Sequence, residues 1–397
     1  MRTIYVLLVA ALVAVGMAAC SKDDKTVGCT DENSVGEVRV TLGFGKSTET
    51  KAIASSTAKP TTAWNKNIKD LMILFVEDGR VKDARKIFSL PTAGDISSQI
   101  FTLTNIKASA SGKQYTVYVI ANSQQAAIKT EIGGNGKTWN ENSCVGQPVT
   151  ALLMKLVVNP EFAPQGDAEA GAVGYSEPAE IFVGKTTNVV IADGNPATIT
   201  ASLERAVSML RVRINQSLNG NDLVDFTGNS ASFRIRRATT AVTPEIALSK
   251  GGKTDVLYTK SPFLSTEPGS GYEGGTILNP SEKITLWKDI RMLPGGSTSV
   301  SAEKFDIVLI GRAQEGYIPL GKTTGLTQPA DVAWTAAVST AIGRNEILEI
   351  NLTLERAGAW LDDPENPGIP DVGEYGNADV NVNLVPWGNI VSEDIPV

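Results

Sequence analysis

The chain has 397 residues, of which 42% are hydrophobic and 20% are charged, so it carries enough apolar content for more than one folded core. The formal net charge of −7 and the scattered Lys and Arg residues argue against a nucleic-acid partner, which requires a basic patch. The chain contains no histidine, the commonest general base and zinc ligand. We therefore expect no catalytic residues, no metal site and no cofactor, although a pair of carboxylates could still hydrolyse a glycoside.

The first twenty residues have the pattern of a lipoprotein signal peptide. An uncharged apolar run extends from Ile4 to Val15, which is short for a membrane span, and small residues then lead to Cys20. Cleavage after residues 1–19 would leave Cys20 to carry the acyl chains, palmitate among them. A plain secretory signal with an incidental cysteine is the alternative. The polar residues 20–35 predict a flexible tether.

The first expected strand covers residues 36–45, because its apolar residues alternate with polar or small ones. These apolar residues are Val38, Val40, Leu42 and Phe44. The segment that follows is rich in Ser, Thr, Ala and Lys, so it predicts an exposed loop that a protease can cut. Its basic residues include Lys46 and Lys51, whereas Arg39 lies inside the strand.

Further strands are expected along the chain, separated by clusters of Gly, Pro and Ser. They cover residues 68–76, 81–88, 114–122, 180–183, 187–191, 206–214, 231–236, 283–287, 305–310 and 346–354. Between the first two, Asp78-Gly79 is a turn signal that predicts a hairpin. Residues 149–158 could form a short helix or another strand. The pattern predicts an all-β fold with a β-sandwich in each half, residues 36–203 and 204–397. Apart from Cys20 the chain has two thiols, Cys29 and Cys144, which could form a disulfide.

The last segment, residues 378–397, follows a polar linker and ends the chain on a strand. Apolar and polar residues alternate there as far as Leu384, and after Pro386 an apolar pattern resumes. Such a strand can complete its own domain. The length of the linker also allows it to reach a neighbouring molecule.

Several segments in this order resemble the fimbrillins of the Bacteroidetes type V pili, which include the major and minor fimbrial subunits of Porphyromonas. The resemblance rests on Cys20, the first strand, and residues 67–79, 117–122, 204–208 and 380–387. It implies two tandem β-sandwich domains of transthyretin-like, Greek-key type, without enzymatic activity. It also implies a lipoprotein on the outer face of the outer membrane, anchored through the lipid on Cys20, and a role for the assembled fimbria in adhesion.

The resemblance further implies how subunits join. A maturation protease removes the first strand, with Val38, Val40, Leu42 and Phe44, and a strand from another fimbrial subunit fills the groove. The corresponding donor residues here are Val380, Val382, Leu384, Val385, Trp387, Ile390 and Val391. The family is cut after arginine, whereas the matching position here is Lys51, with Lys46 and Arg39 nearby. A member that stays uncut would serve as the anchor of the fibre, and the sequence leaves stalk, tip and anchor open, together with the surface ligand on host or bacterial cells.

The rival interpretation is a surface lipoprotein whose β-sandwiches bind glycans for nutrient uptake. Such proteins use exposed aromatic platforms that stack on sugar rings. Six tryptophans are available, but they are dispersed along the chain, and a role as core or loop anchors fits each of them: Trp64, Trp139, Trp287, Trp334, Trp360 and Trp387.

Overall fold

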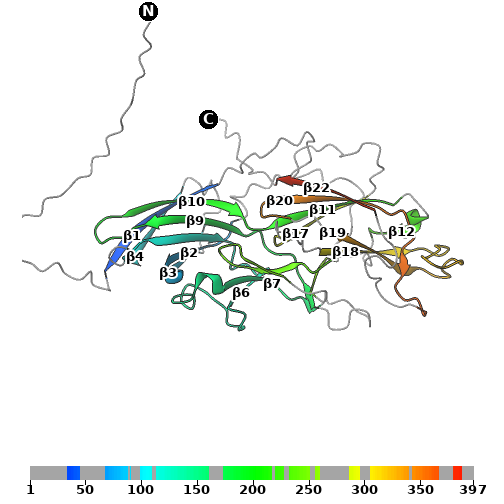
Figure 1. The fold of residues 1–397 in the computed structure, drawn as a ribbon, viewed down its shortest axis with the longest axis horizontal. Coiled ribbons are helices and arrows are strands. Elements are labelled where there is room, and N and C mark those ends of the chain that lie inside the picture. The colour runs from blue at the N-terminus through cyan, green and yellow to red at the C-terminus, as the bar shows by residue number, and fades with distance from the viewer. Residues whose placement is uncertain are drawn as a thin grey trace, which may run out of the picture.

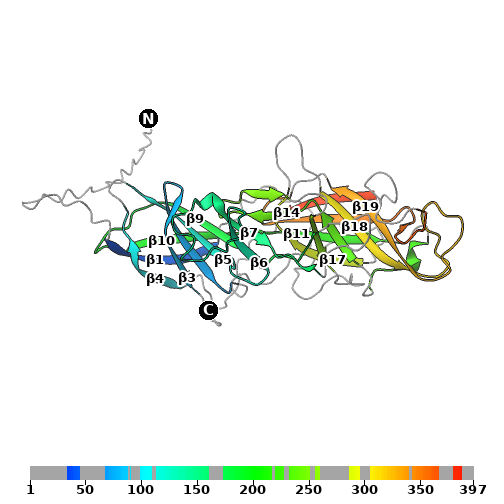
Figure 2. The same cartoon turned by 90° about the horizontal axis from the view of Figure 1, so that it is seen from below.

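The structure is a computed structural model. It describes residues 34–44, 68–87, 90, 99–109, 113–160, 173–216, 220–227, 232–250, 255–259, 286–295, 305–338, 342–365 and 379–386. These residues form β-strands and two short 3₁₀ turns, η2 (Val149–Ala151) and η5 (Asn221–Leu223). No α-helix occurs among them, and hence none that could span a membrane. The predicted all-β class is confirmed. Figures 1 and 2 show an elongated molecule with the first half of the chain at one end and the second half at the other.

The first sheet holds the N-terminal strand in its interior rather than at an edge. Its order is β3 (Arg80–Ile87), β2 (Leu71–Glu77), β5 (Tyr115–Ala121), β9 (Phe182–Val189), β10 (Ala197–Arg205), β1 (Val35–Phe44) and β4 (Ile100–Lys107). The predicted hairpin between β2 and β3 is present, and Asp78 and Gly79 turn it with φ of 49° and 74°. All seven residues of β2 are buried, since both faces of this strand are covered.

The first sheet curls until its two edge strands meet. The backbone N–H of Lys107 in β4 donates to Asp83 Oδ2 of β3 at 3.0 Å, and Arg85 Nη2 donates to the carbonyl of Asn105 at 2.7 Å. The inside of the curl is a hydrophobic core that joins Leu71, Ile73 and Phe75 of β2 to residues of β1, β4 and β10. The first half therefore has a nearly closed barrel with its own core.

The opposite face of β2 and β5 packs against a second, four-stranded sheet. That sheet has the order β15 (Leu248–Lys250), β14 (Thr239–Val242), β7 (Leu152–Leu156) and β6 (Ile128–Ile132). The ambiguous segment 149–158 resolves into the η2 turn followed by β7. The two strands expected at 180–183 and 187–191 were wrong as separate elements, because β9 runs through both and keeps Asn188 at a φ of 61°.

The second half is a sandwich of two sheets. One has the order β21 (Ala359–Trp360), β19 (Ala330–Val338), β18 (Phe305–Ala313), β13 (Ser232–Arg236), β16 (Asp255–Thr259) and β8 (Val173–Tyr175), with β12 (Val224–Asp225) beside β18. The other has the order β17 (Leu286–Met292), β11 (Ser208–Asn215), β20 (Glu346–Thr353) and β22 (Asp379–Pro386). Buried residues from both sheets, such as Val212, Ile350, Ile307 and Trp334, belong to one hydrophobic cluster.

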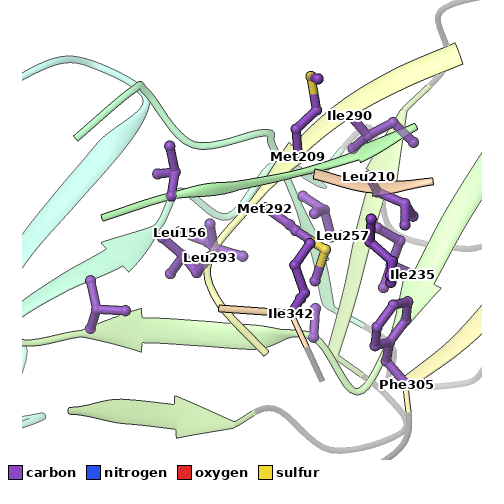
Figure 3. Close-up of a cluster of buried hydrophobic side chains, with 14 of the residues drawn as sticks. Leu156, Met209, Leu210, Ile235, Leu257, Ile290, Met292, Leu293, Phe305 and Ile342 are labelled. Carbon is purple, nitrogen blue, oxygen red and sulfur yellow. The ribbon is translucent and has the colours of Figure 1, made fainter. Parts of the chain in front are cut away.

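The two halves share sheets and core at their junction. Strands β7 and β8 of the first half pair with β14 and β16 of the second half, and one hydrophobic cluster runs from Met72 to Leu354. Figure 3 shows part of this cluster, with Leu156 of β7 in the same region as Met292 and Leu293. The boundary predicted after residue 203 stays a prediction; in the structure the chain passes from β10 to β11, in a different sheet, over residues 205–208.

Polar contacts fix the same junction. Ser208 Oγ donates to the carbonyl of Gly343 at 2.7 Å, and Arg344 Nη2 lies 2.9 Å from Glu204 Oε2. Arg205 is buried and forms an ion pair with Glu180. Removal of one partner of a buried ion pair leaves the other charge unpaired in the interior, which is strongly destabilising. The pair between Arg205 and Glu180 therefore stabilises the chain where β10 ends.

Candidate assembly site

The candidate site is the position of β1 between β10 and β4. β1 pairs with β10 in parallel, from Val38 opposite Ala197 to Phe44 opposite Leu203, and with β4 in antiparallel. Both backbone edges of β1 therefore form sheet hydrogen bonds. β1 and β10 lie near opposite ends of the first half in sequence. Their parallel pairing is therefore a long-range contact and not a hairpin between neighbouring segments.

The side chains of β1 alternate between the core and the surface. Val38 and Val40 are fully buried and Leu42 is 2% exposed, and all three belong to the core inside the curled sheet. Between them, Arg39 is exposed and Thr41 is partly exposed. Phe44 ends β1, and its side chain lies outside the part of the structure that is described. The strand thus contributes one apolar row to the core of the barrel.

The start of β1 is fixed by close packing. A Cβ atom on Gly36 would lie 2.7 Å from Ile191 Cγ2 and 2.8 Å from the carbonyl oxygen of Ala192, so a larger residue does not fit there without movement. The pairing with β4 also shifts register between Gly36 and Val38. These features set where pairing begins and thereby which residues face the core.

The predicted processing residues fall in two classes. Arg39 lies within the paired strand, and its Nε is 2.9 Å from Glu37 Oε1. Lys46 and Lys51, like the predicted lipidation site Cys20, lie outside the described residues. A cut after Arg39 would divide the apolar row, because Val40 and Leu42 follow it.

The predicted donor strand exists as β22 and pairs within its own chain. It lies antiparallel to β20, with Val380 opposite Leu352, Val382 opposite Ile350 and Leu384 opposite Leu348; Val385 lies opposite Ile347. The core-forming residues of β20, Leu348, Ile350 and Leu352, are buried. Among the described strands none pairs with the other edge of β22, so it ends its sheet. Trp387, Ile390 and Val391 lie outside the described residues.

In both halves, the first strand pairs with one parallel strand and one antiparallel strand. β11 pairs in parallel with β20, over Met209 to Asn215, and in antiparallel with β17, just as β1 pairs with β10 and β4. The two halves differ at the next position of the sheet. There, β10 pairs with β9, its neighbour in sequence, whereas β20 pairs with the terminal β22.

Asp83 and Arg85 of β3 hold β4 through side-chain contacts, here called the side-chain clasp, and nothing in the sequence indicated them. Asp83 and Arg85 form an ion pair with each other, and each holds the backbone of β4. They appeared in the sequence as ordinary charged residues of a hairpin. Without β1, this clasp would hold β4 to the rest of the sheet together with the packing of Leu103 and Ile106 in the core.

The tryptophans and thiols take different places. Trp139 and Trp334 are fully buried, and their indole N–H groups donate to the carbonyls of Leu153 and Arg356. Trp360 is partly exposed. Cys144 is a buried free thiol, and burial raises its pKa to about 12. Trp64, Trp387 and Cys29 lie outside the described residues, and the side chain of Trp287 is not described.

The described residues contain no candidate metal centre. No group of three or more His, Cys, Asp or Glu side chains there has the arrangement of a metal site. The charged groups there form ion pairs and small ion-pair clusters, such as Glu131 Oε2 with Lys129 Nζ and Lys155 Nζ at 3.3 Å each.

The chain is similar in sequence to a family of fimbrial proteins. The family model of the fimbrillin-A associated anchor proteins Mfa1 and Mfa2 matches residues 95–270. The predicted resemblance to Bacteroidetes fimbrillins is thus confirmed over this segment, which extends from β4 into the second half. No curated protein sequence matches the chain significantly.

Solved structures of similar overall extent include fimbrial proteins. The fimbrial anchor protein Mfa2 from Porphyromonas gingivalis is 10% identical, with a TM-score of 0.42, covering 81% of this chain and 91% of that one. A fimbrial assembly protein from Parabacteroides distasonis is 11% identical, with a TM-score of 0.38 and coverages of 81% and 92%. A proposed cell adhesion protein from the same organism is 10% identical, with a TM-score of 0.48 and coverages of 91% and 99%.

Proposed function

We propose that the chain is a structural subunit of a cell-surface fimbria, exported as a lipoprotein on Cys20 and joined to neighbouring subunits by strand exchange. The family match to fimbrial anchor proteins supports a fimbrial role. The insertion of β1 between β10 and β4 is the observation that carries the mechanism. In the assembled fimbria the chain serves adhesion.

Removal of β1 would create an acceptor groove. The facing edges of β10 and β4 would each expose a row of unpaired N–H and C=O groups, and the space left by Val38, Val40 and Leu42 would open the core inside the curled sheet. An incoming strand with apolar residues at every second position satisfies both needs at once. The side-chain clasp from Asp83 and Arg85 keeps β4 in place as the far wall of the groove.

The terminal strand supplies the complementary element. β22 contains Val380, Val382 and Leu384 at every second position, the same spacing as the apolar row of β1. In Figures 1 and 2 the blue β1 and the red β22 lie in opposite halves of the elongated molecule. A donor strand therefore fits the groove of another molecule rather than its own. Head-to-tail contacts of this kind generate filaments when the rotation between successive subunits does not close a ring.

The position of the cut decides the role within the fibre. A cut after Lys46 or Lys51 would sever the whole of β1 from the body, together with the lipid, so that a donor strand can displace it, whereas a cut after Arg39 would leave half of the apolar row attached to the body. We therefore favour the lysines as processing sites. A molecule that is not cut keeps both β1 and the lipid, so it would anchor the fibre in the outer membrane.

The mechanism can be tested with a peptide of residues 378–397. Protein trimmed by limited trypsin treatment and separated from its first strand should bind this peptide, whereas uncut protein, in which β1 fills the groove, should not. The matched control peptide carries Val380→Asp, Val382→Asp and Leu384→Asp, which keeps the length and removes the apolar row. Size-exclusion chromatography with a labelled peptide measures binding. Equal binding to cut and uncut protein, or no binding to cut protein, would refute strand exchange.

A second measurement separates the subunit from the anchor. Mass spectrometry of the protein isolated from sheared fimbriae and from membranes reads its first residue directly. A polymerising subunit should begin after Lys46 or Lys51, whereas an anchor should begin at an acylated Cys20. A protein that carries its uncleaved signal peptide in both fractions would contradict lipoprotein export.

A further inference from the structure

A polar cavity lies at the far end of the second half, away from β1. It is about 760 Å³ in volume, between the loop that joins β18 to β19 and the segment that follows β21. These loops lie beyond β18 and β19 at the end of the molecule in Figure 1. The volume falls within the range of about 300–1,000 Å³ that is usual for sites of small ligands. The cavity involves none of the residues placed in the assembly site.

Buried hydrogen bonds hold the walls of the cavity in place. The hydroxyl of Tyr317, which is 1% exposed, donates to Asn221 Oδ1 at 2.8 Å and accepts from the backbone N–H of Gly358 at 2.6 Å. Asn221 in turn donates through Nδ2 to the carbonyl of Leu354 at 2.8 Å. The loop closes on itself through the N–H of Leu326, which donates to the carbonyl of Tyr317 at 2.8 Å. The cavity is therefore preorganised, which reduces the entropy that a ligand must overcome.

The cations of the lining are already neutralised. Arg312 Nη1 lies 2.9 Å from Asp331 Oδ1, and Lys322 Nζ lies 2.9 Å from Asp363 Oδ1 and 2.7 Å from Glu365 Oε2. An anionic ligand would have to displace these carboxylates. Asp362 also lines the cavity and is exposed, and no described residue forms an ion pair or hydrogen bond with it. Its carboxylate is thus free to accept hydrogen bonds from a ligand.

One aromatic side chain and several neutral polar groups complete the lining. Trp360 is partly exposed, and its buried Nε1 atom has no hydrogen-bond partner among the described residues. Thr323, Thr324 and Gln328 are exposed and add two hydroxyls and an amide.

We propose that this cavity binds a neutral oligosaccharide. A sugar ring presents an apolar face of C–H groups, which packs on an aromatic ring, and a rim of hydroxyls, which carboxylate, amide and hydroxyl side chains recognise. The combination of Trp360, Asp362 and Gln328 provides each of these partners. The lack of an uncommitted cation in the described lining excludes sialylated or sulfated glycans as the preferred class. The proposal does not depend on strand exchange, and it places an adhesive contact at the end of the molecule opposite β1.

The test uses purified mature protein and a panel of defined glycans in isothermal titration calorimetry. The panel contains maltohexaose, mannohexaose and lacto-N-neotetraose as neutral probes and 3′-sialyllactose as the anionic probe. At least one neutral probe should bind saturably. Asp362→Asn and Gln328→Ala should each weaken that binding at least tenfold, because both residues are exposed and their loss removes ligand contacts rather than packing.

Further variants test whether a loss of glycan affinity is specific to the cavity. Asp193→Asn makes the same chemical change as Asp362→Asn at an exposed turn of the first half and should leave the affinity within twofold. Trp360→Phe keeps an aromatic ring but reduces its area for stacking, so it should bind more weakly than wild type while unfolding at a similar temperature. Absence of saturable binding by every neutral probe, tighter binding of the anionic probe, or full affinity in both pocket variants would each overturn the proposal.

Discussion

Substitution of Leu42 by alanine tests how strongly β1 is held. Leu42 is 2% exposed and packs into the core inside the curled sheet. Truncation of a buried leucine removes its transfer free energy and leaves a cavity, which together cost about 2–5 kcal/mol. We expect the free energy of unfolding of the intact protein to fall by that amount in urea denaturation followed by circular dichroism.

The whole strand is held far more tightly than one residue. Burial of Val38, Val40 and Leu42 contributes about 1.5–3 kcal/mol each, so the apolar row contributes about 4.5–9 kcal/mol before any hydrogen bond is counted. The net stability of a folded domain is about 5–15 kcal/mol. A cut in the loop after β1 should therefore not release the strand, which stays bound until denaturant or a donor strand displaces it.

The matched control is Arg39→Ala on the same strand. Arg39 is exposed, and its ion pair with Glu37 is open to solvent, so its loss should change the free energy of unfolding by less than about 0.5 kcal/mol. After protease trimming and removal of β1, the bodies of wild type and Leu42→Ala have the same sequence and must unfold alike. A loss below about 1 kcal/mol in the intact variant, or a difference that persists after β1 is removed, would refute the reasoning.

The other predictions concern export, a thiol and a buried carboxylate. Cys20→Ala should leave the precursor unacylated and outside the outer-membrane detergent fraction; unchanged partitioning would contradict lipidation. Because burial raises the pKa of Cys144 to about 12, its thiol should stay neutral at pH 8 and react with a disulfide reagent only in denaturant, whereas rapid labelling of native protein would show that it is accessible. Burial favours the neutral form of Glu131, but hydrogen bonds from Lys129 and Lys155 outweigh it and lower its pKa. A lowered folded pKa stabilises the protein above the unfolded value and loses this contribution as the pH falls through the folded pKa, so Lys155→Met should raise the pH of acid unfolding, and an unchanged acid midpoint would argue against this pair.

Local pattern predicted many of the strands well. Alternation at residues 36–45 and the Asp78-Gly79 turn signal correspond to β1 and to the β2–β3 hairpin. Prediction was weaker where the chain carried no clear period. No strand was expected at β4, which is a neighbour of β1, or at β19, which pairs with β18 in the second sandwich. The two segments predicted within 180–191 were joined because the ladder with β5 continues through both.

The candidate sites likewise divide into residues that the sequence pattern indicated and residues that only folding brings together. The apolar residues of β1 could be found from the sequence, since their period of two reflects one buried face. The clasp from Asp83 and Arg85 and the cavity at Trp360 could not, because each is made by residues from separate segments that become neighbours after folding. The loop from Gly316 to Pro329 carried the only local sign, a density of Gly, Thr and Pro that indicates an ordered turn region.

The sequence by itself determined that the protein is all-β, and it determined which residues of β1 face the core. A strand leaves its two backbone edges to be paired by whichever segments come alongside, and periodicity says nothing about which these are. The tertiary structure decided that β1 lies between β10 and β4, that β7 pairs with β14 and β8 with β16 across the junction of the two halves, and that β22 borders β20. These pairings are nonlocal, and they follow from how the buried faces of distant strands pack together.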